Sequence, residues 1–298
     1  MKGILLINKD INMTSHDVVA ILRRKLSIKR IGHTGTLDPM VTGVLPICIG
    51  TATRVSEYIM AQGKVYRCKM KFGKSTTTYD AHGKDLEYSD RTRFTKDQIL
   101  KAFSHFTGQI EQKPPIYSAV RVKGKRLYSY ARSKEEVEIP SRKVTIYSLD
   151  LISLEGDEVT FDVHCSKGTY VRSLVHDMGI FLGSRAYMKD LVRTEVGRFK
   201  IDDCIPIADI KDMEVDDIKG KVLHIEDSLY NLAELRIDDD ISSRLRNGQK
   251  FNCTRVHYSI GENHQGEIDY NNLKVFVRGE FLGIGKIANN LLKMERVL

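Results

Sequence analysis

Residues 32–39 read Gly-His-Thr-Gly-Thr-Leu-Asp-Pro, and they belong to a longer stretch, residues 32–53, that has no steady hydrophobic period. Four glycines and two prolines interrupt this stretch, so the sequence predicts a structured loop region with short elements. Pro39 disfavours helical geometry at Asp38, which presents that carboxylate on a rigid loop. Enzymes use such a group as a nucleophile or a base, although an Asp-Pro pair alone is more often an ordinary turn.

The segments on both sides of this loop have clear periods. Residues 4–7 form a short apolar run typical of a strand, and Thr14 offers an N-cap for a helix that continues to Leu26. Residues 66–72 alternate strictly, with Tyr66 among the apolar side chains of one face and three basic side chains on the other. The pattern predicts a strand with one buried face and one basic face.

The middle of the chain mixes helices and strands without a βαβ rhythm, which predicts an α+β fold. A capping box at Thr95 indicates an amphipathic helix, residues 144–151 and 159–165 indicate an antiparallel hairpin, and a further helix ends near Gly183. The first of these helices is expected to present four apolar side chains on one face: Ile99, Leu100, Phe103 and Phe106.

The end of the chain has a different organisation. Residues 202–230 are rich in charge and weakly periodic, as in a connecting region, and four short strand-like runs with turn signals between them follow. We therefore expect one domain over residues 1–231 and a small β-rich domain over residues 232–298.

The composition is that of a folded protein with a polyanionic partner. The chain has 298 residues, 41% hydrophobic and 29% charged, and a formal net charge of +8. This charge favours nucleic acid as the partner, and a merely soluble basic protein is the alternative. No apolar run is long enough to cross a membrane, and the first ten residues reach charge too early for a signal peptide. Five scattered cysteines without a C-x-x-C pair predict reduced thiols, hence a cytoplasmic protein.

Residues 32–39 closely resemble the catalytic loop of the TruB family of tRNA pseudouridine synthases, and further segments that resemble this family follow in order. They are Lys9 with residues 14–17, residues 64–67, residues 79–81 with Gly83, residues 114–119, residues 167–172, and residues 191–194 with Gly197. The resemblance implies isomerisation of uridine to pseudouridine at position 55 in the T loop of tRNA, without a metal or a cofactor. It also implies the pseudouridine synthase fold, a mixed and largely antiparallel sheet flanked by helices, followed by a PUA-like RNA-binding domain.

The matching positions imply roles for six residues. These are Asp38 as the nucleophile, Tyr66 packed on the target base, Arg172 as the partner of the Asp38 carboxylate, Leu191 as an apolar wall, and His33 and Tyr170 as further substrate contacts.

Elementary chemistry fits these side chains. An ionised aspartate can attack either the sugar or the base of the target nucleotide, and the planar fork of Arg172 can hold Asp38 in place. Tyr66 can stack on uracil while its hydroxyl acts as a general base or acid, or it can be a core aromatic only. His33 can fill the stack that the flipped base leaves, or it can be a solvent-facing hydrogen-bonding residue.

A basic and aromatic segment is the second nucleic-acid signal. Five basic side chains interleave with three tyrosines in a pattern suited to RNA, although the three glutamates that follow also allow a solvated charged face. The residues are Arg121, Lys123, Lys125, Arg126 and Arg132, with Tyr117, Tyr128 and Tyr130, and then Glu135, Glu136 and Glu138. Residues 124–132 resemble an insertion of the stand-alone bacterial branch of the family.

The chain departs from the family pattern at four positions. Asp10 and Asn12 stand where the family usually has proline and glycine, and asparagine tolerates the left-handed conformation of a glycine. Thr77 and His82 stand where acidic residues are common, which leaves Asp80 as the polar anchor.

Three functions compete at this point: a stand-alone tRNA pseudouridine synthase, a guide-dependent synthase acting on rRNA, and a non-catalytic tRNA-binding or tRNA-folding protein. Only an enzyme needs Asp38, Tyr66 and Arg172 together, so we predict the stand-alone tRNA pseudouridine synthase. This function predicts a monomer that binds the T arm of tRNA and needs no protein partner.

Overall fold

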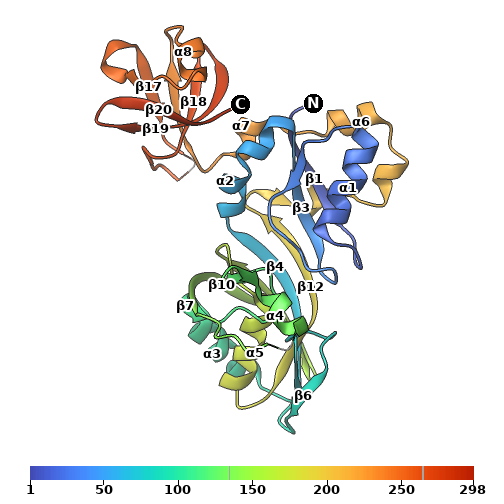
Figure 1. Ribbon diagram of the computed structural model, residues 1–298. Helices are drawn as coiled ribbons and strands as arrows, with labels where there is room; N and C mark the ends of the chain where they lie inside the picture. The colour runs from blue at the N-terminus through green and yellow to red at the C-terminus, as the bar shows by residue number, and fades with distance from the viewer. Residues whose placement is uncertain (134, 264) are drawn as a thin grey trace.

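The computed structural model describes residues 1–133, 135–263 and 265–298, which form two separate sheets. A ten-stranded sheet uses the chain up to residue 206, and a six-stranded sheet uses residues 233–297. In Figure 1, β4 and β12 run side by side between an upper lobe with β1, β3 and α1 and a lower lobe with β10, α3 and α5.

The large sheet has the strand order β14-β1-β3-β12-β4-β11-β10-β7, with β2 on β3 and β13 on β12. Only β1 with β14 and β12 with β3 are parallel among the pairs in the described ranges, so the predicted mixed, largely antiparallel sheet is confirmed. Its strands are β1 (Gly3–Lys9), β2 (Ile31–His33), β3 (Thr42–Ile49), β4 (Lys64–Phe72), β7 (Gly108–Gln112), β10 (Arg142–Glu155), β11 (Glu158–Cys165), β12 (Ala186–Val196), β13 (Phe199–Lys200) and β14 (Ile205–Pro206).

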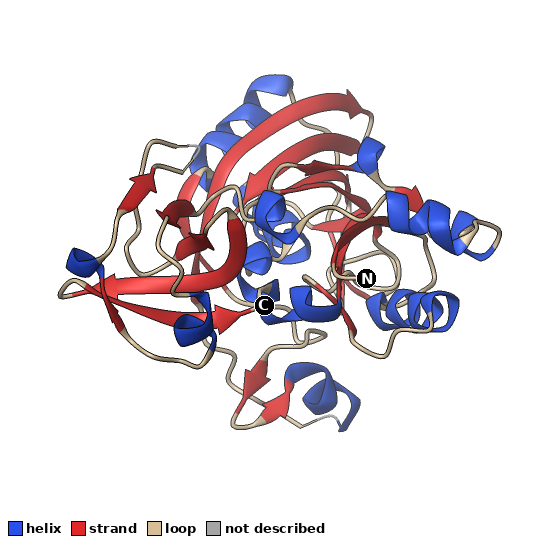
Figure 2. Ribbon diagram, turned by 90° about the horizontal axis from the view of Figure 1, so that it is seen from above, coloured by secondary structure: helices blue, strands red, loops and turns tan. Residues whose placement is uncertain are grey.

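Helices surround this curved sheet, as Figure 2 shows from above. The α-helices are α1 (Ser15–Leu26), α2 (Ser56–Ala61), α3 (Lys96–Phe106), α4 (Leu127–Ser133), α5 (Val171–Phe181), α6 (Val215–Gly220), α7 (Ile225–Ser228) and α8 (Ser242–Arg246). Shorter elements are the 3₁₀ turns η1 (Gly50–Arg54), η2 (Ile201–Asp203), η3 (Asp209–Lys211) and η4 (Cys253–Arg255), and the hairpins of β5 (Lys74–Thr76) with β6 (Asp85–Tyr88) and β8 (Arg121–Val122) with β9 (Lys125–Arg126).

Most of the elements expected from the sequence are confirmed. Thr14 and Thr95 both form complete capping boxes at the starts of α1 and α3. Gly183 follows α5 with a φ of +69°, a left-handed conformation that suits glycine. One side chain of the predicted apolar face of α3 does not fit: Leu100 is 40% exposed, because the buried stripe of this helix is narrower than the four-residue pattern suggested.

The prediction of loop and short elements over residues 32–53 is wrong for β3, a full strand in the middle of the sheet. Seven of its eight residues are buried, so both faces of the strand lack the polar alternation that marks a half-exposed strand. Pro46 lies inside it and donates no hydrogen bond, but its carbonyl accepts two from Thr34. A strand buried on both faces, with a proline inside, gives no period-2 signal.

The basic face of β4 is neutralised by the neighbouring strands. Arg67 makes a two-pronged ion pair with Asp162 of β11, with distances of 2.9 and 2.8 Å, and Lys69 lies 3.8 Å from Glu158. Lys71 pairs with both Asp157 and Glu158. This face is a cross-strand network of exposed ion pairs and not a free basic surface.

The second sheet packs against the upper lobe near η1 and α2 (Figure 1). Ile284 belongs to the same buried cluster as Val55 and Ile59, and Arg296 pairs with Glu57 at 2.7 Å. Its strand order is β16-β20-β19-β18-β15-β17, and it forms the PUA-like C-terminal domain. The strands are β15 (Ala233–Ile237), β16 (Phe251–Asn252), β17 (Tyr258–Gly261), β18 (Leu273–Val277), β19 (Glu280–Ala288) and β20 (Leu291–Val297).

Candidate active site

The loop that carries Asp38 joins β2 to β3 and is pinned along its length. Leu37 is buried, and its amide donates to Ser15 Oγ at 2.9 Å. The carbonyl of Asp38 accepts from the amide of Val41 at 3.0 Å, and Thr34 is anchored to Pro46. These bonds fix the backbone on both sides of Asp38, while its carboxylate remains 40% exposed.

Lys9 ties this loop to the first strand. Its side chain is fully buried, and Nζ donates to the carbonyls of Asp10 at 2.8 Å, Met13 at 2.8 Å and Pro39 at 3.3 Å. Burial lowers the pKa of Lys9 to about 8, although the carboxylates of Asp10 and Asp38 favour its charged form. Asn12 adopts a φ of +62°, the left-handed conformation expected of it.

Arg172, in the first turn of α5, bridges two carboxylates. Its Nη2 lies 2.8 Å from Asp38 Oδ2, and its Nη1 lies 3.3 Å from Asp80 Oδ2. The same two nitrogens also donate to the carbonyls of Thr78 and Tyr117, so the guanidinium has four acceptors while only 5% of the side chain is exposed. Arg172 thus holds Asp38 through one contact, while its contacts to Asp80 and to the two carbonyls fix the guanidinium itself.

Asp80 is the buried anchor of this network. Its side chain is 2% exposed, and its other oxygen accepts from Thr78 Oγ1 at 2.6 Å and from the amide of His82 at 3.0 Å. Thr77, by contrast, lines a separate cavity and accepts from the amide of Lys84. Neither Thr77 nor His82 contributes a side chain to the Arg172 contacts found within the described residues.

A cavity of about 120 Å³ lies beside Asp38 and Arg172. This volume is well below the roughly 300–1,000 Å³ of common small-molecule sites, so it suits one flat ring and not a whole nucleotide. It brings together five of the six residues expected from the sequence, from four separate segments of the chain. Its lining is Thr36, Leu37, Asp38, Val41, Tyr66, Ser118, Ala119, Thr169, Tyr170, Val171, Arg172 and Leu191.

Two tyrosines and a leucine form the ring-binding walls of this cavity. Tyr66 lies on β4, Leu191 lies on β12 and is 7% exposed, and Tyr170 directly precedes α5. Burial raises the pKa of both tyrosines, and the positive charge of Arg193 opposes this shift at Tyr66. The two tyrosine rings and the Leu191 side chain can contact the face of a flat base. Because burial raises their pKa, both tyrosine hydroxyls are protonated near neutral pH.

His33 does not line this cavity. It lies on β2, where its ring makes an edge contact with His16 at a centroid distance of 6.1 Å. Burial lowers the pKa of His33, and the charges of His16 and Arg193 lower it further. Its Nδ1 is buried and has no hydrogen-bond partner among the described residues. The imidazole is thus a neutral, partly exposed ring next to the loop of Asp38.

The basic and tyrosine-rich segment folds onto itself. The guanidinium groups of Arg126 and Arg132 both lie over the ring of Tyr128, at 5.8 and 5.5 Å from its centroid. Lys125 lies 4.7 Å from the ring of Tyr130 and pairs with Glu135 at 2.8 Å. Both the basic and the acidic side chains of this segment therefore share one surface.

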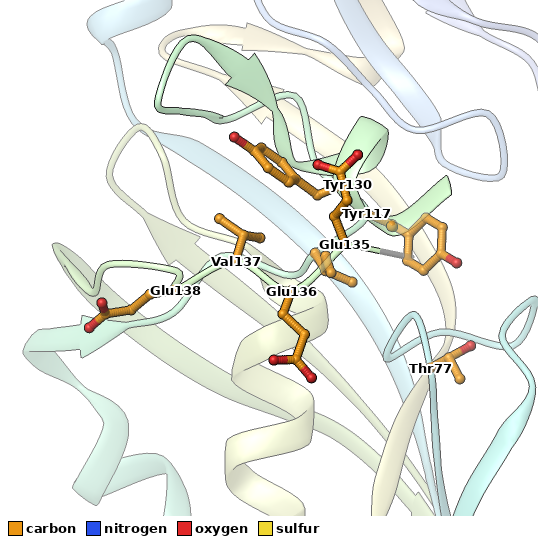
Figure 3. Close-up of a pocket in the computed structure, with 9 residues that line it drawn as sticks. Thr77, Tyr117, Tyr130, Glu135, Glu136, Val137 and Glu138 are labelled. Carbon is orange, nitrogen blue, oxygen red and sulfur yellow. The ribbon is translucent and has the colours of Figure 1, made fainter. Parts of the chain in front are cut away.

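A second and larger cavity, of about 680 Å³, opens beside this segment (Figure 3). Figure 3 shows Glu135, Glu136, Val137 and Glu138 in succession, with Glu135 close to Tyr130 and Tyr117 and with Thr77 apart from them. Three carboxylates repel phosphate groups, so this cavity is not suited to the RNA backbone.

Two buried cations lie near the site, Lys64 and Arg193. The sequence alone assigned no role to either. Lys64 donates to the carbonyls of Met60 and Gln62, and burial lowers its pKa to about 8. Arg193 is 1% exposed. The sequence could have indicated that Arg193 lies near the site, because it follows Leu191 by two residues on a strand and thus shares its face.

The described ranges contain no helix that is long and apolar enough to span a bilayer. Within the same ranges, no group of three or more His, Cys, Asp or Glu side chains is placed to hold a metal ion.

Comparison with known proteins gives a consistent result. Residues 23–171 match the family model described as the TruB family pseudouridylate synthase N-terminal domain, and residues 172–229 match the tRNA pseudouridylate synthase B C-terminal domain. The chain is similar over its whole length to the tRNA pseudouridine synthase B of Clostridium tetani (strain Massachusetts / E88), with 39% identity and full coverage of both chains. It is 47% identical to the Staphylococcus aureus (strain JH9) protein of the same name, over 84% of this chain and 85% of that protein.

Solved structures with the same fold include the "Crystal Structure of a Cbf5-Nop10-Gar1 Complex". The matched chain has a TM-score of 0.73 and 27% identity, and the match covers 95% of this chain and 78% of that one. A structure titled "Structure of H/ACA RNP bound to a substrate RNA containing 2'-deoxyuridine" also gives a TM-score of 0.73, at 24% identity, over 99% of this chain and 84% of that one.

Proposed function

The chain belongs to the TruB family of pseudouridylate synthases, and from this premise we propose that it isomerises uridine to pseudouridine at position 55 in the T loop of tRNA. Asp38 is the nucleophile of this reaction. The observation that carries the proposal is the pairing of Asp38 with the buried Arg172 at the wall of a cavity sized for one ring.

A uridine within a folded loop is stacked on its neighbours, so the enzyme must extrude it before any chemistry can occur. Unstacking costs a few kcal/mol, which contacts in the cavity must offset. Tyr66 and Leu191 supply stacking and apolar contact with the uracil ring, and Tyr170 closes the cavity from the side of α5. His33 precedes the loop that carries Asp38, and its neutral ring can fill the vacated stack.

The carboxylate of Asp38 then attacks the sugar or the base, and the bond between N1 and the ribose breaks. Arg172 keeps Asp38 aimed while bound RNA excludes water, because its other contacts are to the buried Asp80 and to two backbone carbonyls. After rotation, the uracil rejoins the ribose through C5, and a base removes the C5 proton. The Tyr66 side chain, in its phenolate form, is the proton acceptor for that step.

The relatives named tRNA pseudouridine synthase B support a stand-alone enzyme over a guide-dependent one. The protein of that name from Clostridium tetani is 39% identical to this chain over the whole length of both. The matched chain of the Cbf5-Nop10-Gar1 complex shares the fold at a lower identity of 27%. The protein is therefore expected to act on tRNA as a monomer, without a guide RNA or an obligatory protein partner.

Release of tritium from a tRNA transcript labelled at C5 of uridine tests this function directly. The purified protein alone should release tritium over many turnovers per molecule, since every isomerisation removes the C5 proton. Binding of the transcript without tritium release would support a non-catalytic tRNA-binding protein. Release that requires an added guide RNA would support the guide-dependent alternative.

Replacing Tyr66 by phenylalanine should separate stacking from proton transfer. The ring of Phe still packs on uracil, so tRNA affinity should change by less than about threefold, which is below 1 kcal/mol. The loss of the hydroxyl should slow tritium release by about 10²-fold or more, the scale of general acid–base catalysis. An unchanged rate of release would confine Tyr66 to stacking.

Removal of residues 232–298 tests the division into two domains. This segment has ten Lys and Arg residues against nine Asp and Glu residues, so most of the excess positive charge lies in residues 1–231. The truncated protein should bind full-length tRNA about tenfold more weakly, a loss of about 1.4 kcal/mol, yet show nearly the same slope of log affinity against log salt.

The same truncated protein should still isomerise an isolated T-arm stem-loop, because every residue of the cavity precedes the cut. Circular dichroism must show that it is folded, because the cut exposes Val55 and Ile59. Inactivity of a folded truncated protein on the stem-loop would mean that the C-terminal domain helps to build the active site.

A further inference from the structure

Arg193 is among the largest fully buried side chains of the molecule, with 1% of its surface exposed. Its Nε donates to the carbonyl of Val44 at 2.7 Å, and its Nη2 donates to the carbonyl of Gly35 at 3.3 Å. No carboxylate in the described part of the chain lies within ion-pair distance of it. A buried guanidinium without an anionic partner is costly, so its position calls for a compensating role.

Arg193 lies next to Tyr66, one of the tyrosines that line the cavity. On the neighbouring antiparallel strands β12 and β4, Arg193 and Tyr66 are direct register partners, so their side chains project from the same face of the sheet. The positive charge of Arg193 acts on the Tyr66 hydroxyl and opposes the effect of its burial.

The surroundings of this pair are positively charged. Lys9 and Lys64 are also buried cations, and like Arg193 they donate to backbone carbonyls. The one carboxylate that lines the cavity, Asp38, is already paired with Arg172. These cations can compensate one negative charge next to Tyr66, such as that of its phenolate.

We propose that Arg193 is a positioning residue for the reaction, which stabilises the Tyr66 phenolate that takes the C5 proton of the target base. This inference rests on the proposed function and extends it to a residue that does not touch the substrate. Arg193 acts through Tyr66, and its bonds to Gly35 and Val44 keep the guanidinium in place beneath the ring.

When uracil has rejoined the ribose through C5, that carbon carries both the new C–C bond and its original hydrogen, and C6 is doubly bonded to N1. The proton leaves C5 for the Tyr66 oxygen, the C5–H electron pair forms the C5=C6 double bond, and the C6=N1 pair moves to N1. N1 then takes up a proton from water, and Tyr66 later returns its proton to solvent.

The test is a titration of residue 66 in the free protein. Tyr66 is replaced by 3-fluorotyrosine, and its ionisation is followed by fluorine NMR in an otherwise unchanged protein and in the Arg193→Gln and Arg193→Met variants. Loss of the neighbouring positive charge should raise the pKa of residue 66 by about one unit or more. Arg67→Gln is the matched control, because Arg67 follows Tyr66 but pairs with Asp162 on the exposed face, and it should cause no such shift.

Arg193→Met guards against misfolding, because an apolar side chain of similar length fills the space without a buried charge or unpaired donors. A folded variant that lacks the Arg193 charge and leaves the pKa of residue 66 unchanged would overturn the proposal.

The pH dependence of tritium release distinguishes stabilisation of the Tyr66 phenolate from a purely structural role of Arg193 in the Asp38 loop. The rate of tritium release should rise with pH, because the fraction of Tyr66 present as phenolate grows. Without the Arg193 charge, the whole profile should move to higher pH, with a roughly 10²-fold lower rate at neutral pH. A profile scaled down at every pH, without displacement, would show that Arg193 only holds Gly35 and Val44, and would contradict the proposal.

Failure of the proposed function would look different. If the unaltered protein released no tritium at any pH, the proposed isomerisation would fail, whereas the titration of residue 66 would still report on Arg193.

Discussion

Asp38→Asn should lower the turnover number by at least about 10⁴-fold, the scale seen when an enzyme loses its nucleophile. The amide keeps the shape of the side chain and an oxygen that can accept from Arg172 Nη2, so the loop and the cavity stay intact. It cannot act as an anionic nucleophile. The affinity for tRNA should change by less than about threefold.

Single-turnover formation of pseudouridine and equilibrium binding of the same transcript provide the two measurements. Asp162→Asn is the matched control, because it removes a carboxylate of the same sheet that pairs with Arg67 on the exposed face. Exposed pairs contribute about 0–1 kcal/mol, so this control should turn over normally. Near-normal turnover by Asp38→Asn would refute the assignment of the nucleophile.

Arg172→Lys should lower the turnover number by about 10²–10³-fold, the usual effect of losing a fixed donor at a reacting centre. Arg172 contacts Asp38, Asp80 and the carbonyls of Thr78 and Tyr117 from two separate nitrogens. A lysine ammonium carries its donors on one atom and cannot span these acceptors. It also leaves the buried Asp80 carboxylate poorly compensated, which destabilises the fold.

Thermal unfolding and single-turnover rates at saturating protein distinguish the two effects. Arg67→Lys is the control, since Arg67 also contacts acidic oxygens from two nitrogens, but both oxygens belong to one carboxylate, Asp162, at the surface. It should leave both quantities nearly unchanged. Full activity of a folded Arg172→Lys enzyme would show that the bridge between Asp38 and Asp80 is unnecessary for catalysis.

Local patterns predicted the elements that are half exposed. The alternation from Tyr66 to Phe72 identified β4, and the capping boxes at Thr14 and Thr95 identified α1 and α3, because each of these elements has one buried side. β3 gave no such pattern, because it is buried on both faces. The ion pairs that cover Arg67 could not be predicted either, because they depend on the register of β4 with β11.

The residues of the site also differ in how far the sequence could predict them. The loop alone made Asp38 only a candidate, because an Asp-Pro pair is more often an ordinary turn. Its role and its pairing with Arg172 followed from a family resemblance and not from spacing, since the two residues lie on a loop and a helix far apart in the sequence. The burial of Asp80 and Arg193 arises from tertiary packing alone. His33 was expected among the substrate contacts, but it does not line the cavity, so that role stays a prediction for mutation to test.

Position-specific mapping of pseudouridine tests the central claim most directly. An unmodified tRNA transcript is incubated with the purified protein alone, with Asp38→Asn in parallel, and every uridine is then examined for conversion. We expect the unaltered protein to form one pseudouridine, at position 55 of the T loop, and Asp38→Asn to form none. Conversion at a different uridine, conversion by both proteins, or no conversion at all would contradict it.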